Sequence, residues 1–141
     1  LRIMKNIKLW LSRFLILVVT FLNLECAISF LVNPGSYAPA YELTGDVGSA
    51  MIRSLGLLFV MWNVPYVVAL IHPVKHRLSL IEAVIMQGIG VIGETILLLA
   101  IPGSHPTLTA SVIRFIAFDG GGLVLLMIAL FLTLRQKQTQ K

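Results

Sequence analysis

Four apolar stretches, each long enough to cross a lipid bilayer, limit how this chain can fold. A membrane-spanning helix needs about 20 predominantly apolar residues. In lipid, every backbone polar group must be bonded within the protein, so separate apolar segments cross as helices. The stretches are Leu9–Val32, Ser49–Ile71, Leu78–Ile101 and Leu108–Leu134. We therefore predict an all-α membrane protein, a four-helix antiparallel bundle that forms a single domain over residues 1–141.

Helix breakers separate these stretches. Asn33-Pro34-Gly35 ends the first, Pro73 the second and Pro102-Gly103 the third, and proline and glycine are the strongest local interruptions of a helix. The first stretch has no small-residue cleavage site and is too long for the apolar core of a signal peptide. We therefore expect an uncleaved helix there.

The basic residues indicate how the helices are oriented. Only 12% of the residues are charged, against roughly 25% in a soluble domain. Most of the lysines and arginines fall at the N-terminal end, between the second and third stretches, or at the C-terminal end: Arg2, Lys5, Lys8, Arg13, Lys75, Arg77, Arg135, Lys137 and Lys141. The other two connections contain none. The positive-inside rule then predicts that both termini lie in the cytoplasm.

The two halves of the chain share a pattern. In each half a glutamate, Glu25 or Glu94, precedes a Pro-Gly pair by nine or eight residues. In each half an arginine, Arg53 or Arg114, ends a string of two small residues, one apolar residue and isoleucine. This pattern indicates two duplicated helical hairpins, related by an axis along the membrane normal as in some transporters. A chance likeness between two apolar hairpins is the alternative.

These four residues form a charged quartet. A charge inside a membrane-spanning segment is costly and marks a functional site by default. We expect Glu25, Arg53, Glu94 and Arg114 to lie at similar depth, on the side of the membrane opposite the termini. Guanidinium groups bind carboxylates bidentately, so the quartet predicts a buried charge layer that neutralises itself and fixes the bundle. A binding pocket or a relay built on the same residues is the alternative.

A second polar layer lies nearer the middle of the bilayer. It contains Asn63, Gln87 and Asp119, one from each of three stretches. Trp62 and Tyr66 lie beside Pro65, which removes a backbone hydrogen bond and predicts a kink near Asn63. We take the following as a candidate ligand or proton site: Asn63, Gln87, Asp119, Trp62 and Tyr66. Simple hydrogen bonding between helices is the alternative.

The sequence contains no recognisable catalytic, metal or cofactor motif. His72, His76 and His105 fall at the ends of stretches or in connections, so none is an axial ligand for a haem inside the bundle. Zinc needs further ligands, and phosphate-binding loops and nucleophile motifs are missing. We expect no catalytic residue, no metal, no cofactor and no nucleic-acid partner.

Several residues resemble positions in small bacterial four-helix membrane proteins of the DoxX-like kind. They are Arg53 with Gly56 in the second stretch, and Arg114, Phe118-Asp119 and Gly122-Leu123 in the fourth. The resemblance covers most of the chain in length, helix count and loop pattern. It implies the bacterial cytoplasmic membrane as location. Because some members are subunits or partners of membrane redox complexes, it also implies other membrane subunits as partners.

Three functions remain open at this point. The small size, the glycines of the third and fourth stretches and the missing catalytic set favour a non-catalytic accessory subunit of a larger membrane complex or a homo-oligomer. The two polar layers suit a small carrier or binding protein for an apolar or lipid-like molecule. The third hypothesis is a membrane enzyme that uses Glu94 or Asp119 as acid or base.

Overall fold

The computed structural model of the chain describes residues 2–134 and 136, and the regular elements within this part are all helical. Their bounds are α1 Arg2–Val32, α2 Pro34–Tyr37, the 3-10 helix η1 Ala38–Tyr41, α3 Gly45–Trp62, α4 Val64–Ile71, α5 Arg77–Ala100 and α6 Pro106–Leu134. The prediction of an all-α chain is confirmed for these residues. The C-terminal basic residues Arg135, Lys137 and Lys141 lie outside them.

Four segments of the described chain are helical, long and apolar enough to cross a membrane: Asn6–Val32, Gly45–Ile71, Arg77–Ala100 and Pro106–Leu134. Within their most apolar parts, only 28%, 22%, 11% and 11% of the residues are buried inside the molecule. The outward faces are therefore apolar over most of their length. Water disfavours so large an apolar surface whereas lipid does not, which indicates a membrane protein.

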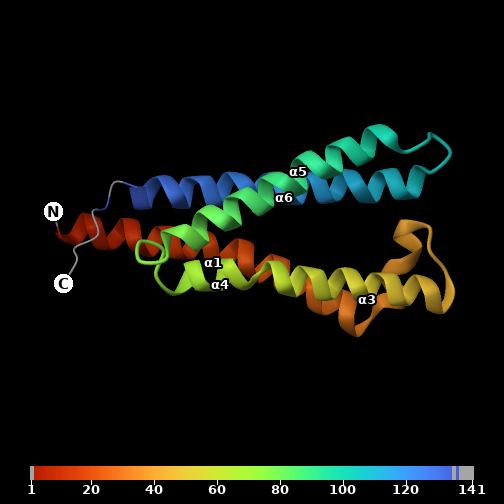
Figure 1. Ribbon diagram of the computed structural model, residues 1–141, viewed down its shortest axis with the longest axis horizontal. Coiled ribbons are helices and arrows are strands. Elements are labelled where there is room, and N and C mark those ends of the chain that lie inside the picture. The colour runs from red at the N-terminus through yellow and green to blue at the C-terminus, as the bar shows by residue number, and fades with distance from the viewer. Residues whose placement is uncertain (1, 135, 137–141) are drawn as a thin grey trace.

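The long helices lie lengthwise in one elongated body (Figure 1). α1 runs away from the end at which the chain begins, and α2 and η1 form a compact loop at the opposite end. α3 and α4 lead back, α5 leads out again and α6 returns. α1 packs against α3, α4 and α6, and α5 packs against α4 and α6. We call the end that holds the start of α1 and the α4–α5 turn the closed end, and the opposite end the loop end.

Three helices extend beyond the apolar stretches that predict them. α1 begins at Arg2 and not near Leu9, because residues 2–8 contain no proline or glycine to stop it. α3 begins at Gly45, after Thr44 in extended conformation, with Asp46 in its first turn where a negative charge suits the helix dipole. α6 begins with Pro106, which is favourable at the first helical position. Polar ends therefore continue the helices past the lipid-compatible residues.

The second membrane-length segment is broken at Asn63, where α3 ends and α4 begins. Pro65 lies in the first turn of α4 and has no N–H to bond to the preceding turn. The Asn63 side chain donates to the carbonyl of Phe59 at 2.6 Å, and the same oxygen accepts the backbone N–H of Asn63 at 3.2 Å. The predicted kink is confirmed.

At the closed end, the helices surround one apolar core. Its buried members come from α1, α4, α5 and α6: Ile16, Val19, Tyr66, Ala69, Leu80, Ala83, Leu126 and Ala129. Two arginines add hydrogen bonds between helices. Arg13 Nε donates to the carbonyl of Leu70 at 3.1 Å, and Arg77 Nη2 donates to that of Thr133 at 2.8 Å. The ends of α1 and α4, and those of α5 and α6, are therefore held together.

At the loop end, an aromatic cluster fills the space beneath the α1–α3 connection. Phe30 is its centre, and the rings of Tyr37, Tyr41, Phe59 and Phe115 lie with centroids 5.0–6.4 Å from that of Phe30. These rings come from α1, the connection, α3 and α6. Stacking between them is directional and adds to simple apolar burial.

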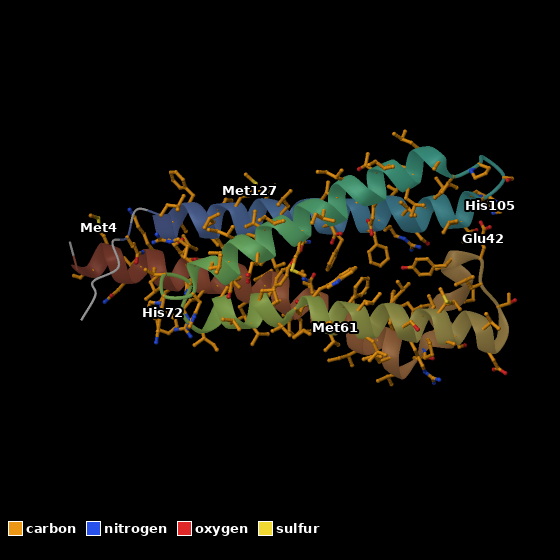
Figure 2. All side chains as sticks on the ribbon, viewed as in Figure 1. Met4, Glu42, Met61, His72, His105 and Met127 are labelled. Atoms are coloured by element: carbon orange, nitrogen blue, oxygen red, sulfur yellow. The ribbon has the colours of Figure 1, made fainter. Side chains whose placement is uncertain are left out.

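A single clasp joins the two connections at this end. His105 Nδ1 lies 2.5 Å from Glu42 Oε2, and the backbone N–H of Leu108 donates to Glu42 Oε1 at 3.2 Å. Figure 2 shows Glu42 and His105 facing each other across the loop end. The hydrogen bond from His105, followed by that from Leu108, holds the pKa of Glu42 below its ordinary value.

Candidate functional site

A cavity of about 390 Å³ lies between the four membrane-length segments, around the middle of the bundle. Every one of these segments contributes to its lining, which consists of Asn23, Cys26, Phe59, Trp62, Asn63, Tyr66, Met86, Gln87, Ile89, Gly90, Gly93, Glu94, Phe115, Phe118 and Asp119. The five residues predicted as a ligand or proton site are all among them. The structure therefore brings these five to one place.

A chain of hydrogen bonds crosses the cavity wall from α4 to α6. The Tyr66 hydroxyl donates to Gln87 Oε1 at 2.5 Å, and Gln87 Nε2 donates to Asp119 Oδ1 at 3.0 Å. Tyr66 and Gln87 are buried. Each side chain fixes the orientation of the next, because an amide that accepts at its oxygen must present its N–H₂ group to the carboxylate.

Two glycines leave space for the hydrogen-bonded side chains of Gln87 and Asp119. A Cβ atom at Gly122 would lie 2.6 Å from Gln87 Nε2, which is closer than van der Waals contact allows. A Cβ atom at Gly90 would clash in the same way with the Asp119 carboxylate. Because glycine lacks that atom, α5 and α6 approach closely with polar side chains between them.

A second polar pair lies on the α1 side of the cavity. Asn23 Nδ2 donates to Asn63 Oδ1 at 3.3 Å, and Asn63 is buried. The amide of Asn63 thus bonds to α1 through its oxygen and to the α3 backbone through its nitrogen. The break between α3 and α4 is therefore tied to the cavity wall.

Glu94 lies on the lining, one helical turn from Gly90 along α5. Its Oε2 atom is buried and has no hydrogen-bond partner among the described residues. A buried carboxylate oxygen without a partner is costly. This atom is the unsatisfied polar group of the cavity.

The charged quartet does not assemble as predicted. Glu25, Arg53 and Arg114 are exposed, and only Glu94 reaches the cavity. Among residues 2–134 and 136, no ion pair joins any two of the four, and the one ion pair present is that of Glu42 with His105. Their equal depth along the helices says nothing of direction around each helix axis, and three of the four side chains point outward.

The two glutamates of the proposed repeat accordingly have different surroundings. Glu25 is exposed on α1 and accepts a hydrogen bond from Ser29 at 3.4 Å, one turn further along the same helix. Glu94 is partly buried in the cavity lining. Arg114 donates to Ser111 at 3.0 Å, which is also a contact within one helix. A self-neutralising layer built on all four residues is not formed.

The sequence prediction included Trp62 and Tyr66 but missed the three phenylalanines of the cavity wall. Phe59 precedes Asn63 by four residues on α3, and Phe115 and Phe118 precede Asp119 on α6 by four and one. Helical residues three or four positions apart share a face. On α5, Gln87, Gly90 and Glu94 are likewise spaced by three and four. The same spacing applied around Asn63, Gln87 and Asp119 finds Phe59, Gly90 and Phe115, whereas Phe118 lies outside it.

The described part of the chain contains no group of three or more His, Cys, Asp and Glu side chains placed to hold a metal ion. His72 receives a hydrogen bond at Nδ1 from the backbone N–H of Lys75, at the closed end and away from the cavity (Figure 2). No known protein family, curated protein or solved structure matches this chain. The cavity itself is therefore the basis for a proposed function.

Proposed function

We propose that this chain is a bacterial inner-membrane protein that binds an apolar or lipid-like molecule in its central cavity, without chemical conversion. The four membrane-length helices would form an antiparallel bundle of two duplicated hairpins, with both termini cytoplasmic. The single observation that carries the proposal is the cavity, whose apolar lining includes the hydrogen-bonded side chains of Tyr66, Gln87 and Asp119. About 300–1,000 Å³ is usual for a small-molecule site with apolar walls and a few placed polar groups, and 390 Å³ falls in that range.

The lining divides into the two parts that such a ligand needs. Phe59, Trp62, Phe115 and Phe118 offer apolar faces for a hydrocarbon or ring system. Gln87, Asn63 and the carboxylates offer hydrogen-bonding groups for a polar head. Trp62 and Ile89 are 48% and 65% exposed while also lining the cavity. Their exposure supports entry from the surrounding lipid.

Photolabelling tests this proposal. The protein in lipid nanodiscs would be irradiated with hexadecanol that carries a diazirine, and the labelled residues mapped by mass spectrometry. We expect saturable labelling of the cavity lining. A leucine at Gly93 should abolish it, because that glycine lines the cavity and no atom lies within 4 Å of the added Cβ. Gly88→Leu is the matched control, on the same helix with equal space but outside the lining.

Labelling spread evenly over the outward faces, and unchanged by Gly93→Leu, would contradict the binding function. Saturation by unlabelled hexadecanol separates a site from simple partition into lipid. The Gly88→Leu protein should keep the wild-type labelling pattern, since its new side chain lies outside the cavity lining.

An accessory subunit is the second candidate. At Gly88 on α5, and at Gly120 and Gly121 on α6, an added Cβ atom would have no other atom within 4 Å, and small residues permit close approach of another helix. The DoxX-like resemblance would make the partner a membrane redox complex. Gentle extraction followed by native mass spectrometry tests this role. A lone monomer that carries no partner would speak against it.

A further inference from the structure

The cavity has an unusual charge composition. Two carboxylates line it, Glu94 from α5 and Asp119 from α6, and its lining contains no lysine, arginine or histidine. The nearest arginine along α6, Arg114, is exposed and bonded to Ser111. The cavity is therefore an acidic site inside a segment that lipid surrounds.

Neither carboxylate is fully satisfied by the protein. Oε2 of Glu94 is buried without a partner in the described chain. Asp119 receives its one described side-chain hydrogen bond, from Gln87, at Oδ1. A carboxyl group removed from water keeps its negative charge when a cation lies beside it, and takes up a proton when none does. The space between these groups thus favours a positive charge that the protein does not supply.

The aromatic wall favours the same kind of ligand. Phe59 lies between Trp62 and Phe115, with ring centroids at 5.7 and 6.0 Å. Ring faces carry negative potential and attract cations, most strongly when water is excluded. They also contact apolar bodies without needing a hydrogen bond. The carboxylates and the ring faces would therefore both attract a cation bound in the cavity.

We propose that the ligand is a lipophilic organic cation, an apolar and partly aromatic body that carries one positive charge. This inference rests on the proposed function and names the ligand class of the same cavity. The charge is held near Glu94 and Asp119, and the apolar body lies against the rings of Phe59, Trp62 and Phe118. A molecule of this class dissolves in the membrane and reaches the cavity past the exposed edge of Trp62.

Binding of tetraphenylphosphonium tests the inference, with tetraphenylborate as a probe of the same shape and opposite charge. Both would be measured by equilibrium dialysis against the protein in zwitterionic nanodiscs, with empty nanodiscs subtracted. We expect saturable binding of the cation and none of the anion. Removing either charge, by Glu94→Gln or Asp119→Asn, should weaken cation binding about tenfold or more, as the loss of one partner of a buried charge pair does.

Glu82→Gln is the matched control, because Glu82 is a carboxylate on the same helix α5, exposed and outside this cavity. Its cation affinity should equal that of the wild type. The neutral hexadecanol probe reports whether Glu94→Gln and Asp119→Asn keep the cavity. Both variants should still be labelled, which separates a lost charge from a lost fold.

The outcomes distinguish the two proposals. Cavity labelling by hexadecanol without tetraphenylphosphonium binding would overturn the cationic ligand and leave the binding function intact. Equal binding of both ions, or cation binding unchanged in the Glu94→Gln and Asp119→Asn variants, would also overturn it. Failure of both hexadecanol and tetraphenylphosphonium to occupy the cavity would remove the binding function itself.

Discussion

The same four membrane-length segments form a packed apolar core at the closed end and a cavity in the middle of the bundle. At the closed end, Ile16, Leu80 and Leu126 are fully buried against one another's helices, and arginine side chains connect the helix ends. In the middle, the same helices diverge around a cavity whose walls are rings and polar groups. At the closed end the helices are joined mainly by apolar packing. Around the cavity they are joined by hydrogen bonds between polar side chains.

Tyr66 is the residue at which the two regions meet. It belongs to the closed-end core and also lines the cavity. Its hydroxyl donates to Gln87, which in turn donates to Asp119. The hydrogen-bonded side chains of Tyr66, Gln87 and Asp119 therefore lie next to the apolar core of the closed end.

The strongest test of this contrast is to remove core volume at the closed end. Leu80 is fully buried, so Leu80→Ala should lower the free energy of unfolding by about 2–5 kcal/mol through lost contacts and a new void. Ile89→Ala, on the same helix at the cavity rim and 65% exposed, should cost far less. Denaturant unfolding of both variants in mild detergent measures the difference.

Equal losses in the two variants would contradict the division into a packed base and an open middle. A Leu80→Val variant serves as an intermediate step. Its loss should lie between those of the wild type and Leu80→Ala, because it removes less volume from the same site.

A second test concerns the contact between α1 and α3 nearer the loop end. A Cβ atom at Gly56 would lie 2.9 Å from the carbonyl oxygen of Ala27 and 3.0 Å from Leu31 Cγ. Gly56→Ala must therefore push α3 away from α1 and should cost about 1–3 kcal/mol, as other overpacking substitutions do. Thermal unfolding measured by circular dichroism reports the loss.

Gly93→Ala is its control, since the added methyl group enters open space. Because alanine has the higher helix propensity, Gly93→Ala should leave the stability unchanged or raise it by up to about 1 kcal/mol. If Gly56→Ala were as harmless as Gly93→Ala, α1 and α3 would not be in the close contact described, and the cavity wall formed by Phe59 would not be anchored.

Much of the fold could be predicted from the sequence because apolar length and helix breakers are local signals. Pro65 and Asn63 predict the kink between α3 and α4, and the structure has it there. The ends of the helices were less predictable. Hydropathy marks the part compatible with lipid, whereas the helices continue beyond it through polar residues, α1 back to Arg2 and α3 back to Gly45.

The candidate site was predictable in part, for a physical reason. Asn63, Gln87 and Asp119 are polar groups inside apolar helices, and such residues point inward and bond across helices. Gln87 bonds Asp119, and Asn63 bonds Asn23 in addition to its local bond to Phe59. A long arginine side chain near a helix end can extend toward water in place of the bundle interior. Glu25, Arg53 and Arg114 do not converge, and their depth alone gave no information on direction.

The weakest of these effects concerns the clasp at the loop end, which holds the two connections beside the open part of the bundle. The pKa of Glu42 lies below its ordinary value of 4.5, because His105 and the backbone of Leu108 donate hydrogen bonds to the carboxylate. The folded protein thus favours the ionised form. The stability that Glu42 adds is full above its unfolded pKa and is lost as the pH falls through the lowered folded pKa.

Glu42→Gln keeps the shape of the side chain and removes its titration. Near neutral pH the wild type should melt at a slightly higher temperature than Glu42→Gln, and the gap should close as the pH falls below 4.5. The effect is small because Glu42 and His105 are exposed to water. A gap that persists undiminished in acid would show that the clasp stabilises the loop end by shape and not by charge, and the difference between the two ends would then rest on packing alone.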